Sequence, residues 1–199
     1  MKNIKTKQEI LESHKIILIF GVPCAGKSVL TYNTFVKDKE IIDKVDIMKY
    51  VETNNFCLIG NYPINSHRRG LDTLERKQVG NLSSQVQNLL KQGKSVILEG
   101  NRCMSRPMMN ELPLNDVVML WIKCDLDIAL KRANIDRQLK DNEQMKIINS
   151  TYSMCNNFIN GYRYVDTYII DTTNCDDFED KTLFDFDWNK VEQEVILWL

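Results

Sequence analysis

A glycine-rich segment follows directly on an apolar run near the start of the chain. The run is Ile16–Phe20, and the segment reads Gly21-Val-Pro-Cys-Ala-Gly-Lys-Ser28. Five consecutive apolar residues bounded by glycine are typical of a buried strand. Gly21 and Gly26 allow the backbone to turn sharply without a side-chain clash. The pattern therefore predicts a strand, a tight loop and a helix in succession, which places the chain among α/β folds.

The chemistry of this segment favours phosphate binding. Consecutive backbone N–H groups of such a loop point at phosphate oxygens, and the dipole of the following helix adds positive potential. We expect Lys27 to reach the β- and γ-phosphates of a nucleoside triphosphate, and the Ser28 hydroxyl to bind Mg²⁺. The sequence thus predicts ATP and Mg²⁺ as cofactors, although the preference for ATP over GTP stays open. The expected cofactor-binding residues are Gly21, Val22, Pro23, Cys24, Ala25, Gly26, Lys27, Ser28 and Val29.

Three further apolar runs alternate with helical patterns along the chain. They are Ser95–Leu98, Val117–Lys123 and Thr167–Ile170. Buried strands that alternate with helices predict a parallel sheet covered on both faces, with ligands beyond the carboxyl ends of the strands. We expect a three-layer α/β/α sandwich of the P-loop NTPase type with a central, mostly parallel sheet. The length suits one domain over residues 1–199.

The sequence predicts three helices, the first and the last from apolar residues at three- and four-residue steps, and the second from Asp125, which can cap it after the strand at 117–123. The first starts at Leu71 and ends before Gly93, and the second begins at Leu126. A third is expected at the end of the chain, where the apolar positions are Trp188, Val191, Val195 and Trp198.

Three segments are less regular. Residues 41–62 fit either a hairpin of two strands or one strand with an insertion. Residues 61–70 and the region around 172–186 are expected to be disordered or adaptable.

Charge and cysteine content exclude several classes of protein. Lys and Arg number 26 against 27 Asp and Glu, a net charge of −1, so there is no global basic field to attract nucleic acid nonspecifically. The six cysteines form no C-x-x-C pair and only two histidines are present, which indicates neither a zinc site nor a disulfide framework. The polar first residues predict no signal peptide, and no apolar run approaches about 18 residues. We therefore expect a cytoplasmic protein with reduced thiols and no membrane partner.

Two classes of nucleotide protein fit poorly. An N-K-x-D segment, with which a GTPase would read its base, does not occur in the sequence. Motor and AAA-type ATPases would show a strand that ends in Asp-Glu, whereas the strand at 95–98 is followed by the single acid Glu99.

The phosphate loop together with Glu99 resembles the small P-loop kinases of the nucleoside and nucleotide kinase group, over most of residues 15–175. The resemblance implies that Glu99 lies beside Mg²⁺ and the acceptor. It also implies a lid over about residues 130–145, in which Arg132 and Arg137 close on the transferring phosphoryl group. Such cations neutralise the phosphoryl oxygens in the transition state. Two solvated charges on a helix face are the alternative for these arginines.

A narrower resemblance rests on Leu58-Ile-Gly-Asn-Tyr62 and Arg69-Gly-Leu-Asp-Thr-Leu74. These segments are similar to a Gly-x-Tyr and Gly-x-Asp-x-Leu arrangement in bacteriophage P-loop kinases, among them 5-hydroxymethyluracil DNA kinases. About fifteen residues are covered. The resemblance implies DNA as the acceptor and, for a viral protein, the host cytoplasm as its location.

Four side chains are candidates for binding the acceptor. Tyr62 could stack on a base, and Arg69 and Arg102 could contact a phosphate of a nucleotide or of DNA. Asp72 could orient the acceptor. Asp72-Thr-Leu-Glu75 is equally a capping-box arrangement before a helix, which leaves a purely structural interpretation open.

Two acids could take the proton of an acceptor hydroxyl, namely Glu99 and Asp46, which follows a predicted strand. The leading hypothesis is a Mg²⁺-ATP-dependent phosphotransferase that acts on a nucleoside, nucleotide or nucleic-acid acceptor. The alternatives are a nucleotide-binding regulatory protein without an acceptor and an ATPase stimulated by a partner. A small acceptor or DNA, and the oligomeric state, both stay open.

Overall fold

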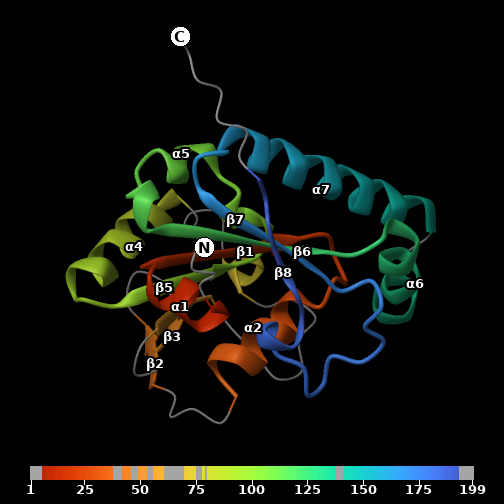
Figure 1. Cartoon of the computed structure of the whole chain (residues 1–199), viewed down its shortest axis with the longest axis horizontal. Coiled ribbons are helices and arrows are strands. Elements are labelled where there is room, and N and C mark those ends of the chain that lie inside the picture. Colours follow the sequence, from red (N-terminus) through yellow and green to blue (C-terminus); the bar gives the residue numbers. More distant parts are fainter. Residues whose placement is uncertain are drawn as a thin grey trace, which may run out of the picture.

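Figure 1 shows the computed structural model of the chain, which describes residues 6–37, 42–45, 49–52, 56–60, 70–74, 78, 80–137 and 141–192. The described strands form one eight-stranded sheet in the order β2-β3-β4-β5-β1-β6-β7-β8. Their bounds are β1 (Ile16–Gly21), β2 (Ile42–Val45), β3 (Lys49–Glu52), β4 (Phe56–Ile59), β5 (Ser95–Glu99), β6 (Val117–Lys123), β7 (Asp166–Asp171) and β8 (Trp188–Lys190).

The middle of the sheet is parallel. Strand β1 pairs in parallel with β5 on one side and β6 on the other, and the parallel pairing continues to β4 and β7. Strands β2, β3 and β8 extend the two edges in antiparallel fashion. The expected α/β class with a mostly parallel central sheet is therefore confirmed.

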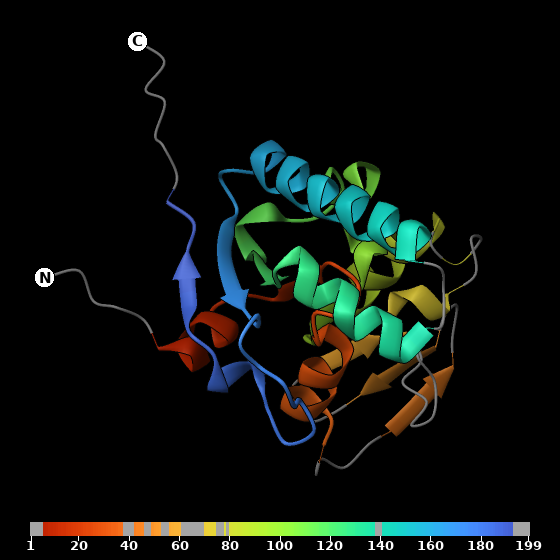
Figure 2. The ribbon, with the colours of Figure 1, turned by 90° about the vertical axis from the view of Figure 1, so that its right-hand side faces the viewer.

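Helices cover both faces of this sheet, as Figures 1 and 2 show for α7 on one side and α2 on the other. Residues Ile16, Leu18 and Phe20 of β1 join the core beneath α4, α5 and α7, whereas Ile17 and Ile19 join the core beneath α1, α2 and α6. Alternate residues of a strand point to opposite faces, and a strand buried on both faces is apolar throughout. The helices are α1 (Lys7–Glu12), α2 (Lys27–Phe35), α4 (Leu82–Lys91), α5 (Arg106–Met109), α6 (Leu126–Arg137) and α7 (Asp141–Gly161).

The four predicted apolar strands are present as β1, β5, β6 and β7, with ends within one residue of the expected ones. The ambiguous region 41–62 contains three described strands, β2, β3 and β4, joined as an antiparallel meander. Strand β3, with the sequence Lys49-Tyr-Val-Glu52, was not among the expected strands.

The helix expected from Leu71 is wrong at its start. Leu71–Thr73 forms a short 3₁₀ turn, η1, and the next residue, Leu74, has extended backbone angles (φ −74°, ψ 144°) that a helix cannot contain. The described helix α4 begins at Leu82 and ends before Gly93 as expected. Asp72 lies inside η1, whose cap position is Gly70, so the capping-box interpretation of Asp72 is also wrong.

The predicted end helix is wrong at its first position, because Trp188 begins strand β8, which pairs with β7. The indole N–H of Trp188 donates to the Leu183 carbonyl (2.9 Å), and its ring stacks on that of Phe184. Edge pairing and these ring contacts outweigh the helical spacing. Val195 and Trp198 lie outside the described residues.

Helix α6 confirms the helix predicted at Leu126, and α7 follows it after residues 138–140, which are not described. The two helices pack against each other. The end of α6 and the start of α7 fall in the segment 130–145 that was expected to form a lid. No described helix has the length and apolar character needed to cross a membrane.

Candidate functional site

The Gly21–Ser28 segment links the end of β1 to the start of α2, as its pattern predicts. The backbone adopts left-handed angles at Cys24 (φ 61°) and Gly26 (φ 84°). A Cβ at Gly26 would lie 2.5 Å from the Phe178 ring, and one at Gly21 would lie 2.0 Å from the Ile122 carbonyl oxygen. Glycine is required at both positions because neighbouring atoms already fill the space.

The loop lies where the strand order reverses. After β1 the chain continues to β2 and the other strands on the β5 side of the sheet, whereas after the neighbouring strand β6 it continues to β7 on the opposite side. In open α/β sheets this switch point opens a crevice at the carboxyl ends of the strands, and ligands bind there.

Lys27 is turned into the loop. It is the first residue of α2, its side chain is buried, and its ammonium group donates to the Val22 carbonyl oxygen (2.8 Å). Gly26 at the cap position has no side chain to accept from the first N–H groups of α2. A helix start of this kind, with an ammonium group beside it, can hold phosphate oxygens.

Ser28 meets Glu99 at the centre of the site. The Ser28 hydroxyl donates to a carboxylate oxygen of Glu99 (3.1 Å), and Glu99 is 1% exposed at the end of β5. The amide oxygen of Asn101 lies 3.5 Å from the backbone N–H of Gly21, which joins the end of β5 to the start of the loop.

The Ser28 hydroxyl oxygen and the Glu99 carboxylate could together bind Mg²⁺. Magnesium takes oxygen ligands and is usually bound by one or two protein groups together with water and substrate phosphates. Ser28 and Glu99 would supply the protein part. Within the described residues, no group of three His, Cys, Asp or Glu side chains could hold a metal ion by itself.

The charges of the site converge on a buried thiol, Cys103. Burial raises the pKa of Cys103 well above its ordinary value, and the carboxylates of Glu99 and Asp72 raise it further, while the Lys27 ammonium group lowers it. The pKa of Cys155 on α7 is raised to about 11 by burial, again opposed by Lys27. Lys27, Glu99 and Asp72 therefore lie within electrostatic range of the same thiol.

Arg102 and Asp72 belong to one structural unit at this edge of the sheet. Arg102 donates to the carbonyl oxygens of Leu71 (3.3 Å) and Leu74, at the two ends of η1. A Cβ placed on Gly100 would lie 3.4 Å from a carboxylate oxygen of Asp72. Arg102 thus fastens the turn that carries Asp72 to the end of β5.

Arg132 holds the loop that follows β7. Its guanidinium group donates to the carbonyl oxygens of Thr172 (3.0 Å), Thr173 (3.3 Å) and Cys175 (2.5 Å), and lies 5.0 Å from the centre of the Phe178 ring. Arg137 is the last residue of α6, and its side chain lies outside the described part of the structure.

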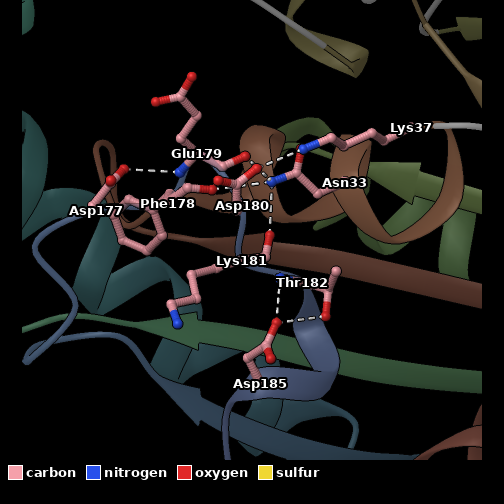
Figure 3. Close-up of polar contacts among 9 residues, drawn as sticks. All are labelled: Asn33, Lys37, Asp177, Phe178, Glu179, Asp180, Lys181, Thr182 and Asp185. Carbon is pink, nitrogen blue, oxygen red and sulfur yellow. Dashed lines mark hydrogen bonds and ion pairs between the residues drawn. The ribbon is translucent and has the colours of Figure 1, made fainter.

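Helix α2 also holds the loop after β7. The sequence did not predict these contacts and favoured an adaptable segment over 172–186. The Asn33 amide on α2 donates to the carbonyl oxygens of Phe178, Glu179 and Lys181 at 3.0, 2.9 and 2.7 Å (Figure 3). The Lys37 ammonium group lies 2.8 Å from an oxygen of Asp180. The loop after β7 therefore packs against α2. Nothing in the sequence around Asn33 signals this contact.

Thr172 is a further residue that sequence reasoning missed. Its hydroxyl is fully buried and donates to the Ala25 carbonyl oxygen (3.0 Å), inside the Gly21–Ser28 loop. Together with Arg132 it couples the end of β7 to the loop after β1. Its place directly after an apolar strand is the signal that could have found it.

The structure gathers part of the predicted site and leaves part outside its described residues. Residues 21–29, Glu99, Arg102, Arg132 and Asp72 all lie at the carboxyl edge of the parallel strands. Of the remaining candidates, Asp46, Tyr62 and Arg69 lie outside the described residues, as does the side chain of Arg137. The ends of the segment that carries Tyr62 and Arg69 meet, because a Cβ on Gly60 would lie 2.3 Å from the Gly70 backbone.

No protein-family model matches the chain, and no curated protein matches it either. The residues of the site themselves carry the functional proposal.

Proposed function

We propose that the chain is a P-loop phosphotransferase that uses Mg²⁺-ATP to phosphorylate a nucleoside, nucleotide or nucleic-acid acceptor. The observation that carries the proposal is the meeting of Lys27, Ser28 and Glu99 where β1 and β5 end. Each of these residue types has a separate task in phosphoryl transfer, and the sheet brings them to one point.

Lys27 would contact the β- and γ-phosphates. Its ammonium group lies inside the loop on the Val22 carbonyl oxygen, from which a short side-chain movement would reach a phosphate oxygen. Phosphoryl transfer depends chiefly on positioning and charge stabilisation, so a cation held in this place favours transfer.

Ser28 and Glu99 would hold the metal. Bound Mg²⁺ neutralises charge on the phosphate oxygens and orients them. The Ser28 hydroxyl would turn from Glu99 toward the metal, and Glu99 would accept hydrogen bonds from the water around it. The resemblance to nucleoside and nucleotide kinases supports the same assignment.

The Lys27→Ala variant tests the proposal. Transfer of labelled γ-phosphate from Mg²⁺-ATP is measured on nucleosides, nucleoside monophosphates, oligonucleotide ends and 5-hydroxymethyluracil-containing DNA. We expect transfer by the wild type to one of these and a loss of about 10²-fold or more in Lys27→Ala, which is the range for removal of one transition-state donor.

Lys15→Ala is the matched control, because Lys15 is exposed and precedes β1 at the opposite end of the strand. Its activity should equal that of the wild type. Tight ATP binding without transfer to any acceptor would favour a regulatory protein instead. ATP hydrolysis that rises only with an added partner would favour an ATPase. Equal transfer by Lys27→Ala and the wild type would refute the assignment.

A further inference from the structure

Turn η1 carries Asp72 to a defined place beside the phosphate loop. The backbone N–H of Gly100 donates to the Ile19 carbonyl oxygen (2.9 Å), so Gly100 lies next to the last residues of β1. Asp72 faces Gly100 closely enough that a side chain there would contact its carboxylate. Asp72 is exposed, and through its neighbour Gly100 it lies near the end of β1, from which the Gly21–Ser28 loop departs.

The two carboxylates of the site differ in their surroundings. Glu99 is 1% exposed and accepts from the Ser28 hydroxyl, which ties it to the metal side of the site. Asp72 is exposed on its 3₁₀ turn and can be reached by a second substrate. Glu99 is therefore placed to serve the metal, whereas Asp72 is placed to serve the acceptor.

Among the described residues, Arg102 is the cation that contacts the turn of Asp72, and its guanidinium group donates to the Leu71 and Leu74 carbonyl oxygens. An acceptor phosphate needs cations around it and would meet the negative charge of Asp72. An acceptor hydroxyl needs a group that takes its proton, and a carboxylate does so.

On the basis of the function proposed above, we propose that the acceptor is an alcohol hydroxyl and that Asp72 is its general base. The hydroxyl proton passes to an Asp72 carboxylate oxygen as the hydroxyl oxygen forms a bond to the γ-phosphorus of ATP. The bond from that phosphorus to the bridging oxygen of the β-phosphate breaks, and ADP leaves with that electron pair. Asp72 then returns the proton to solvent.

Arg102 is a positioning residue in this scheme. It acts on the acceptor through η1, because its two hydrogen bonds hold the turn on which Asp72 stands. Asp72 itself would contact the reacting hydroxyl.

The experiment compares acceptors and variants in the full-length protein. Labelled γ-phosphate transfer is measured with nucleosides, hydroxymethyluracil-containing DNA and nucleoside monophosphates, using the wild type, Asp72→Asn and Asp116→Asn. Asp116 is also an exposed acid on a 3₁₀ turn, Leu114–Asp116, before β6 at the opposite end of the strands. ATP binding is measured by calorimetry in each protein.

We expect label on a hydroxyl, with a loss of about 10²-fold or more in Asp72→Asn, unchanged ATP binding and full activity in Asp116→Asn. Label on the nucleoside would identify a free small acceptor, and label on the hydroxymethyl group would identify DNA. Either result supports an alcohol acceptor.

Two results would overturn the inference and leave the kinase function standing. They are Lys27-dependent transfer to the phosphate of a monophosphate, and hydroxyl transfer by Asp72→Asn at the wild-type rate. Absence of Lys27-dependent transfer to every acceptor would overturn both proposals. Should Asp72→Asn fail to fold, the chemical group labelled by the wild type decides the acceptor class by itself.

Discussion

Gly26 lies where the Gly21–Ser28 loop, helix α2 and the Phe178 ring meet. Its left-handed backbone (φ 84°) disfavours any other residue, and the ring fills the space that a methyl group would need. We expect Gly26→Ala to lower the free energy of unfolding by about 1–3 kcal/mol. Nucleotide binding should weaken as well, because the N–H groups of the loop would shift. Denaturant unfolding and calorimetric titration with Mg²⁺-ATP would measure the two effects.

The strain at Gly26 has two sources that a second substitution separates. Phe178→Ala removes the ring and leaves the backbone angle, so Gly26→Ala should cost less stability in the Phe178→Ala background than in the wild type. An equal cost in both backgrounds would show that the ring does not crowd this position.

Among the elements, the loop after β7 owes its conformation to side chains far away in sequence. The Asn33 amide donates to three of its carbonyl oxygens, and a carboxylate at this position would face those oxygens with no proton to donate. Asn33→Asp should therefore lower the free energy of unfolding by about 1–3 kcal/mol. Urea unfolding measures the loss. Asn88→Asp, on the exposed side of α4, serves as the control. Equal unfolding midpoints for the two variants would contradict the role of Asn33.

The sequence predicts those elements whose cause is local. Strands β1, β5, β6 and β7 are continuous apolar runs, and the loop after β1 is specified by its own glycines. Strands β3 and β8 are short, lie outside the parallel middle of the sheet and lack a continuous apolar run, so their conformation comes from hydrogen bonds to neighbouring strands. The same limit applies to the site. The contacts of Asn33, Arg102 and Arg132 with carbonyl oxygens form only when distant segments meet, so no spacing along the chain reveals them.

At the scale of the whole molecule, the core on both faces of the sheet holds protonated thiols. Six cysteines are free, and four of them are fully buried, at positions 57, 103, 124 and 155. Burial raises the pKa of Cys155 to about 11 and that of Cys103 well above its ordinary value. In the unfolded chain these thiols ionise near pH 9, before they do so in the folded protein. The unfolded state therefore binds fewer protons between about pH 9 and 11, and stability falls as the pH rises through this range.

Cys155→Ala isolates one of these thiols. The raised pKa of Cys155, about 11 in the folded protein, implies that this thiol accounts for about 1 kcal/mol of the stability lost between pH 8 and pH 10. Urea unfolding at pH 8, 9 and 10 should show a shallower decline in Cys155→Ala than in the wild type, even though the variant starts from a lower stability because it leaves a cavity. Cys175→Ala removes a half-exposed thiol and should keep the wild-type decline. Parallel declines in all three proteins would mean that the loss of stability at alkaline pH arises from other groups. The Lys190–Asp166 ion pair at the sheet edge would then be the next to remove, because the Asp166 carboxylate raises the pKa of Lys190.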